Sequence, residues 1–280
     1  MPSPDESISS PVKQPATAQR WLVVFVLVLA VMVAALVAFP RLRHKLLGSG
    51  LGDRLHAAAK HEGYDGHLHY LTRGSLDYRE VALTIDDGPH PEWLPTILKA
   101  LKKHQVHATF FLVGKMVKAH PELAKQIVAE GHELGDHSMN HPRFDTITIP
   151  EVKQEILDCA AEIQKATGVK VNLVRPPGVR LNEKILVAAR DLGFTTIAEN
   201  AGAHDFILEG DYSWYPGHAG FEEHVKKIVT DIDKQLKNGV IIDLHDMPAT
   251  AYAMDALVAD IESRGYKIVT ASQLLAHARH

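Results

Sequence analysis

The chain has 280 residues, of which 46% are hydrophobic and 23% are charged, as in an ordinary globular protein. Its formal net charge of −4 at pH 7 argues against a basic surface for nucleic acid, so no nucleic-acid partner is expected. The single cysteine, Cys159, excludes an intrachain disulfide and a cysteine-rich zinc site. Its apolar neighbours predict that this side chain is buried.

The first 39 residues differ in composition from the rest of the chain. Residues 1–20 are rich in Ser, Pro and Ala, which predicts a disordered tail. Residues 21–39 contain no charge and would form a helix about 28 Å long, close to the thickness of the hydrocarbon core of a bilayer. We therefore predict a single-pass signal anchor over residues 21–39, with a cleaved signal peptide as the alternative.

The charges around the predicted span leave its orientation open. Lys13 and Arg20 precede the span and three basic residues follow it, a small bias toward a cytoplasmic C-terminal domain. Residues 40–78 have weak periodicity and predict a stalk. The catalytic domain is then expected over residues 79–280.

Apolar runs alternate with helical patterns in the rest of the chain. The predicted strands cover residues 81–85, 109–113, 132–135, 171–174, 194–198, 240–244 and 267–270. The predicted helices cover residues 92–104, 115–130, 149–167, 182–192, 221–237 and 251–264. This α/β alternation indicates right-handed βαβ units and a parallel sheet, either open or closed into a barrel.

Polar side chains follow most of the predicted strands at their carboxyl ends. In chain order they are Asp86 and Asp87, His137 and His141, Arg175, Asp205, and His245. A site assembled from the ends of many strands is typical of a barrel, whereas an open sheet places its site at one switch point. The pattern therefore favours a barrel.

One Asp and two His can hold a metal ion and leave a position open for water. His137 and His141 are four residues apart, so a helical turn would place them on one face. Asp86 and Asp87 supply a ligand and a base if the following turn brings both into the mouth, because a continuing strand would direct them to opposite faces. Each pattern alone is common at surfaces and turns; their combination predicts a metal-dependent site.

Two further residues have a structural and a catalytic interpretation. Arg175 ends an apolar strand, where it could form an ordinary ion pair or hold a carboxylate in a charged, oriented state. His245 ends another apolar strand, where it could be a satisfied core residue or a general acid. Asp205 and Asp246 are the candidates to raise its pKa.

Four segments together resemble the motifs of the polysaccharide deacetylase family, the NodB-homology metal-dependent carbohydrate esterases. They are LTIDDGP, GHELGDHSMNHP, VRPPGVRLN and VIIDLHD, and the resemblance extends from about residue 80 to about residue 275. It implies a distorted (β/α)7 barrel, here preceded by the predicted N-terminal transmembrane helix.

The resemblance also implies a metal site and its base. Asp87, His137 and His141 would bind a divalent metal, with Zn2+ as the expected ion and Co2+ or another divalent ion as the alternative. Asp86 would be the base that activates water, and Arg175 would orient Asp86.

The resemblance further implies an acid and an acyl pocket. His245 would protonate the leaving amine, with Asp205 as its support. Leu244 and Phe206 would line the pocket for the acetyl methyl group, and Phe206 replaces the tryptophan that is usual in the family.

The third motif departs from the family pattern because it lacks the aromatic residue before its glycine. The backbone at that aromatic position donates a hydrogen bond to the oxyanion in the family. Pro177 has no N–H to donate, so Gly178 is the nearest candidate.

The predicted function is therefore metal-dependent removal of N-acetyl groups from a glycan, with peptidoglycan N-acetylglucosamine as the expected substrate. The catalytic domain of a cell-membrane protein with this substrate would lie outside the cytoplasm. The alternatives are a deformylase or deacetylase of a lipid-linked aminosugar, a deacetylase of chitin oligomers, and a sugar-binding pseudoenzyme without activity.

Overall fold

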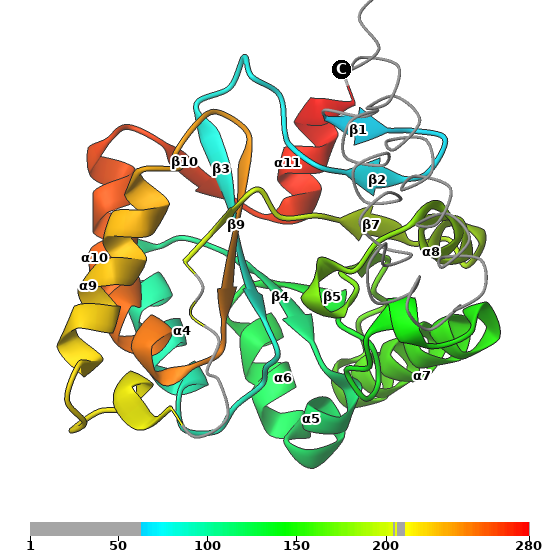
Figure 1. Cartoon of the computed structure of the whole chain (residues 1–280), viewed down its shortest axis with the longest axis horizontal. Helices are drawn as coiled ribbons and strands as arrows, with labels where there is room; N and C mark the ends of the chain where they lie inside the picture. Colours follow the sequence, from blue (N-terminus) through cyan, green and yellow to red (C-terminus); the bar gives the residue numbers. More distant parts are fainter. Residues whose placement is uncertain (1–62, 204, 206–210, 280) are drawn as a thin grey trace, which may run out of the picture. The chain divides into compact units, whose positions relative to one another are not determined.

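The computed structural model describes residues 63–203, 205 and 211–279, and every structural statement below refers to them (Figure 1). The predicted tail, the predicted membrane span and the predicted stalk up to residue 62 lie outside the described residues. Within the described part of the chain, no helix is both long enough and apolar enough to cross a membrane.

Ten strands form one sheet. They are β1 (Tyr64–Asp65), β2 (Tyr70–Leu71), β3 (Glu80–Asp86), β4 (Thr109–Leu112), β5 (Glu133–Asp136), β6 (Leu173–Val174), β7 (Thr195–Ile197), β8 (Ala201–Gly202), β9 (Val240–His245) and β10 (Lys267–Val269). Their order is β1-β2-β7-β6-β5-β4-β3-β9-β8, with β10 paired to the first half of β3. All pairs are parallel except β1 with β2. The predicted parallel α/β sheet is confirmed.

The predicted distorted barrel is confirmed in part. The pairing runs from β1 to β8 without joining these two ends in the described residues. The sheet nevertheless curls, and Arg175, which follows β6, reaches across its inner face to hydrogen-bond to residues of both β3 and β9. An open, curled sheet fits a distorted barrel, although strand pairing does not close it.

Eight α-helices accompany the sheet in the described residues (Figure 1). They are α4 (Leu94–His104), α5 (Gly114–Ala119), α6 (Pro121–Ala129), α7 (Ile149–Thr167), α8 (Glu183–Asp191), α9 (Phe221–Asp233), α10 (Pro248–Ser263) and α11 (Ala271–Ala278). The bounds of α7 are the predicted ones, set by a capping box of Thr148 with Glu151 and by Gly168 at φ 78°. The helix predicted over residues 115–130 is two helices, because Pro121 cannot continue the hydrogen bonding of α5.

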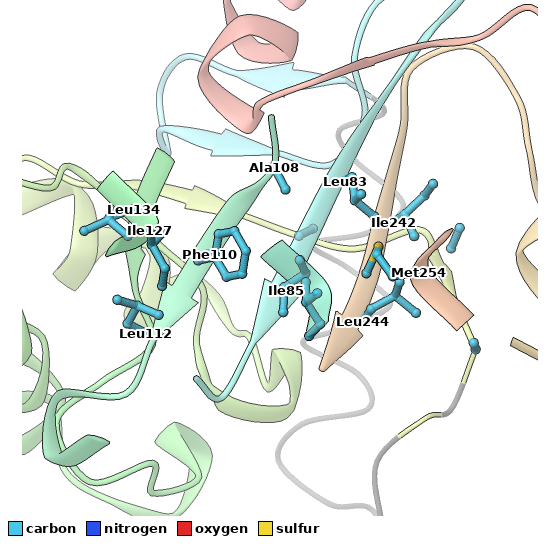
Figure 2. Close-up of a cluster of buried hydrophobic side chains, with 14 of the residues drawn as sticks. Leu83, Ile85, Ala108, Phe110, Leu112, Ile127, Leu134, Ile242, Leu244 and Met254 are labelled. Carbon is cyan, nitrogen blue, oxygen red and sulfur yellow. The ribbon is translucent and has the colours of Figure 1, made fainter. Parts of the chain in front are cut away.

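The outer face of the sheet is apolar. Leu83 and Ile85 of β3 point outward with Ile242 and Leu244 of β9, and they pack with Met254 of α10 (Figure 2). These side chains are fully buried. Cys159 of α7 belongs to the same core, as predicted, and its thiol donates to the Leu112 carbonyl.

The inner face holds a smaller apolar cluster near the amino ends of the strands. Its members come from seven strands and from α11: Leu71, Ala82, Phe111, Leu173, Ile197, Ile241, Val269, Ala271, Leu274 and Leu275. The backbone N–H of Ala271 donates to Thr109 Oγ1 at 2.8 Å, which places α11 at the beginning of β4. With this end filled, the carboxyl ends of the strands are left for polar groups.

Two segments differ from the sequence-based prediction. Residues 64–71, predicted to be stalk, contain β1 and β2, and β2 pairs with β7. The sheet therefore begins before residue 79. Helix α11 was not predicted, although Thr270 and Gln273 form a capping box at its start.

Candidate metal centre and active site

The two adjacent carboxylates at the end of β3 approach the same imidazole. Asp86 is the last residue of the strand and points inward by alternation with Thr84. Asp87 has a φ of 72°, a left-handed conformation that is uncommon outside glycine and that ends the alternation. His137 Nε2 consequently lies 3.6 Å from Asp86 Oδ2 and 3.5 Å from Asp87 Oδ1. The turn after β3 thus places both carboxylates at the carboxyl end of the sheet, as the proposed metal site requires.

The two histidines lie close together but not on a helix. His137 follows β5, and the loop after it contains left-handed Ser138 (φ 69°) and His141 (φ 62°). The backbone and side-chain amides of Asn140 donate to the Glu155 carboxylate, which fixes the loop to α7. The imidazole centroids are 5.0 Å apart. The helical turn considered for residues 137–141 is wrong. The two imidazoles lie side by side because of the conformation of the loop that joins them.

Asp87, His137 and His141 form a group that could hold a metal ion. One ligand atom from each lies within 4.8 Å of the others. His137 Nδ1 lies 2.7 Å from the Arg175 carbonyl, which can only accept, so Nδ1 carries the proton and Nε2 offers its lone pair. Asp87 Oδ1 is buried and lies 3.1 Å from His141 Nε2 and 3.5 Å from His137 Nε2. A carboxylate oxygen that faces two imidazole nitrogens at such distances fits the ligand set of a divalent cation.

Arg175 binds Asp86 inside the curled sheet. Its side chain is fully buried over the Phe111 ring, and Nη1 donates to Asp86 Oδ1 at 2.8 Å. The same nitrogen donates to Thr84 Oγ1 at 2.7 Å and to Asp243 Oδ1 at 2.8 Å. Burial raises the pKa of Asp86 to about 6, although the Arg175 charge acts in the opposite direction. This carboxylate is therefore oriented and more basic than an exposed one.

His245 ends β9 beside Asp86, with which it is paired in register. Its Nδ1 lies 2.8 Å from Asp205 Oδ1, and its backbone N–H donates to Asp205 Oδ2 at 2.8 Å. The Thr250 hydroxyl also donates to Asp205 Oδ2. Burial alone would lower the pKa of His245, but the Asp205 carboxylate outweighs it and holds that pKa well above its usual value. Of the two predicted carboxylate partners, Asp205 contacts the imidazole, whereas Asp246 accepts the His90 backbone N–H at 2.7 Å.

A polar cavity of about 240 Å³ adjoins His245 and Asp205. Two of its lining residues, Glu199 and Asp243, are carboxylic acids that the sequence analysis did not select. Burial of its carboxyl group, reinforced by Asp243, raises the pKa of Glu199 to about 8. The raised pKa favours the protonated form of Glu199, which can donate to Asp243, and Asp243 in turn accepts from Arg175. The signal for Asp243 was present, because it interrupts an apolar run two residues before His245 and so shares its face.

The residues predicted to bind substrate lie in different places in the structure. Leu244 lies on the outer face of β9, packed in the core beneath the helices, so its predicted role in the acyl pocket needs a correction (Figure 2). Phe206 lies outside the described residues. Pro177 is buried and Gly178 is exposed in the short 3-10 turn η2 (Pro177–Val179), two and three residues after Arg175.

Comparison with known proteins agrees with these motifs. Residues 73–197 match the family described as polysaccharide deacetylase. The peptidoglycan-N-acetylglucosamine deacetylase of Bacillus cereus is 32% identical over 200 residues, which cover 70% of this chain and 87% of the relative. The peptidoglycan-N-acetylmuramic acid deacetylase PdaC of Bacillus subtilis is 33% identical over 196 residues, which cover 69% of this chain and 38% of the relative.

A solved structure also has this fold. It is a family 4 carbohydrate esterase pseudoenzyme from Bacillus anthracis, with a TM-score of 0.66, 29% identity and coverage of 74% of this chain and 68% of that one. The family match over residues 73–197 contains the strands that precede Asp86, Asp87, His137 and Arg175. The chain therefore belongs to the polysaccharide deacetylase family, and its enzyme class is that of the hydrolases that remove N-acetyl groups from polysaccharides.

Proposed function

We propose that this protein hydrolyses the N-acetyl group of peptidoglycan N-acetylglucosamine in a metal-dependent reaction. The observation that carries the proposal is the convergence of Asp86 and Asp87 on His137 while Arg175 holds Asp86 from the other side. This separates the two carboxylates into one that is oriented for proton transfer and one that faces the imidazole nitrogens. The name of the Bacillus cereus relative supports the substrate.

Asp87, His137 and His141 would hold the divalent cation, with zinc as the expected ion. Such an ion, when bound, polarises the amide carbonyl and lowers the pKa of the attacking water. Imidazole binds a metal ion in its neutral form, and burial lowers the pKa of His137 to about 3, so this ligand is neutral. The carboxylate of Asp87 supplies the one negative charge of the set.

Asp86 would accept the proton of the attacking water. Its Oδ1 is held by Arg175, and Oδ2 faces the metal side near His137 Nε2. A base with a pKa near the working pH transfers protons well, and burial raises the pKa of Asp86 in that direction. The geometry therefore suits general-base catalysis.

His245 would donate a proton to the nitrogen that leaves when the C–N bond breaks. Asp205 engages Nδ1 and favours the imidazolium, so the proton at Nε2 is the one available for transfer. The products are acetate and the free amine of the sugar.

Acetate release by the full chain tests this function. Peptidoglycan, N-acetylglucosamine oligomers and a lipid-linked N-acyl aminosugar are compared at equal concentrations. Preferred release from N-acetylglucosamine in peptidoglycan supports the proposal, whereas preferred turnover of N-acetylmuramic acid, chitin oligomers or the lipid-linked sugar would change the substrate. No release from any of them would favour a sugar-binding pseudoenzyme, a reading that the presence of Asp86, Arg175, Asp205 and His245 argues against.

We further propose that the catalytic domain faces the cell wall and is anchored by residues 21–39. The support is the location of peptidoglycan outside the membrane and the uncharged segment itself. Protease added to intact spheroplasts should then degrade the domain. Protection until lysis would place the domain in the cytoplasm.

A further inference from the structure

We propose that a row of aromatic rings beside the active site binds a sugar of the polysaccharide next to the one that reacts. The row consists of His90, Trp93, Tyr215 and Tyr212. This inference deepens the proposed function and rests on it, because it assigns a binding surface to the polymeric substrate.

The rings of the row lie in consecutive contact. The centroids of His90 and Trp93 are 6.0 Å apart, those of Trp93 and Tyr215 are 6.2 Å apart, and those of Tyr215 and Tyr212 are 6.3 Å apart. Tyr212 also stacks on His218 at 5.9 Å. The row joins the segment before α4 to the short 3-10 turn η3 (Tyr212–Trp214), which lies more than 100 residues later in the chain.

One end of the row is continuous with the candidate active site. His90 is three residues after Asp87, and its backbone N–H donates to Asp246 Oδ2 at 2.7 Å. Asp246 directly follows His245. Figure 1 shows the yellow segment that contains η3 at the lower left, on the side of the sheet where β9 and α9 lie, and the arrows of β3 and β9 run toward the lower half of the picture.

The other end of the row is held in place. Asp211 Oδ1 accepts the Ser213 backbone N–H at 3.1 Å, and Ser213 Oγ lies 2.9 Å from His224 Nε2. Trp214 is buried and stacks on the His224 ring with centroids 3.8 Å apart. Tyr212 is nevertheless 65% exposed. A large exposed ring on a turn that is fixed from both sides is preorganised for a ligand.

The chemistry of the row suits a neutral sugar ring. Tyr212 is the most exposed ring of the row, and the other three rings are half-buried. An exposed aromatic ring can pack against the C–H face of a pyranose, and a tyrosine hydroxyl can bond to its hydroxyl edge. Burial lowers the pKa of His90, so its imidazole stays uncharged near pH 7. Members of this family act on polymers, and a polymer necessarily continues beyond the sugar that reacts.

Chain-length preference tests the proposal with the full chain. The probes are N-acetylglucosamine oligomers of two and six sugars, and the variants are Tyr212→Ala and Tyr212→Phe. Loss of one stacking ring should lower kcat/KM for the hexamer by about three- to tenfold, mainly through KM, and leave the dimer unchanged. Tyr212→Phe should retain most of the hexamer rate because it retains the ring.

Tyr78→Ala is the matched control. Tyr78 is 48% exposed and stacks on His277, but it precedes β3 and so lies at the opposite end of the strand from the site. Its loss should leave both substrates unaffected. An equal fall for dimer and hexamer in Tyr212→Ala, or no fall for either, would overturn the proposal.

Calorimetric titration of the hexamer separates the row from the reaction. If the wild type releases no acetate from either oligomer, the proposed activity on these sugars fails, but weaker hexamer binding by Tyr212→Ala would still support the row. Equal hexamer affinity in the wild type and Tyr212→Ala, or no binding by the wild type, would contradict it.

Discussion

The outer and inner faces of strands β3 and β9 use the same backbone for different purposes. On the outer face, residues such as Leu83 and Leu244 are apolar and pack against helices. On the inner face, the alternating residues Thr84, Asp86 and Asp243 contact Arg175. The difference teaches that the site is positioned by the core, because a side chain cannot move on one face without disturbing its neighbours on the other.

The largest expected effects come from the two adjacent carboxylates. Asp86→Asn removes the proposed base and should lower kcat by about 10²–10⁴-fold, with the metal still bound. Asp87→Asn removes a charged ligand and should lower both metal content and rate. His245→Ala should retain metal and lose rate, as Asp86→Asn does.

Metal content and kcat of the three purified variants decide this prediction. If Asp86→Asn loses the metal while Asp87→Asn retains it, the two roles are reversed. If none of the substitutions slows acetate release, the reaction takes place elsewhere.

The outer face should respond to substitution through stability. Leu244→Ala removes a fully buried side chain and should lower the free energy of unfolding by about 2–5 kcal/mol. The kcat/KM of the folded fraction should stay close to that of the wild type. Chemical denaturation and kinetics at a low temperature measure the two quantities. If Leu244→Ala lost kcat/KM while its stability was unchanged, the result would support the original prediction that Leu244 lines the acyl pocket.

The inner face should give a bell-shaped dependence of kcat/KM on pH. The base must be deprotonated, so the rate should rise with pH through the pKa of Asp86, at or below about 6 because a bound cation favours the carboxylate. The acid must be protonated, so the rate should fall as pH rises through the raised pKa of His245. Asp205→Asn should move this alkaline limb to lower pH. An alkaline limb that does not move in Asp205→Asn would exclude His245 as its origin.

The smallest expected effect is on stability at the edge of the polar cavity. Burial raises the pKa of Glu199 from 4.5 to about 8, so the folded state binds more protons than the unfolded state between these values. The free energy of unfolding contributed by this group is therefore highest below about 4.5 and falls as pH rises toward 8. In Glu199→Gln, the decline measured by urea denaturation from pH 5 to pH 8 should be smaller. The exposed Glu222→Gln is the control, and equal declines in both variants would contradict the prediction.

Much of this arrangement was predictable from sequence, because it follows from local patterns. Alternation and helical periodicity located the central strands and α7, and the motifs selected Asp86, Asp87 and Arg175, which the structure brings together. The direction of the histidine pair was not predictable, because it depends on positive φ angles at Ser138 and His141 that their residue types do not indicate.

Other features were not predicted from the sequence because they are short or are formed by segments that are distant in the chain. Strand β2 has two residues and pairs with β1 and β7, and its pairing with β7 and its burial depend on segments far away in the sequence. Glu199 acquires its environment from Asp243, which is more than 40 residues away in the chain. Tertiary contacts of this kind leave no local pattern, whereas the capping box before α11 did leave one and could have been used.

The most direct test of the account is the metal dependence of acetate release by the full chain. The protein is exhaustively chelated, its metal content is measured, and zinc is then restored. The account predicts that turnover is lost on chelation and returns with zinc, while circular dichroism shows that most of the fold persists, because the core does not include the three proposed ligands. Full turnover by protein verified to be free of metal would contradict the central claim that Asp87, His137 and His141 form a catalytic metal centre.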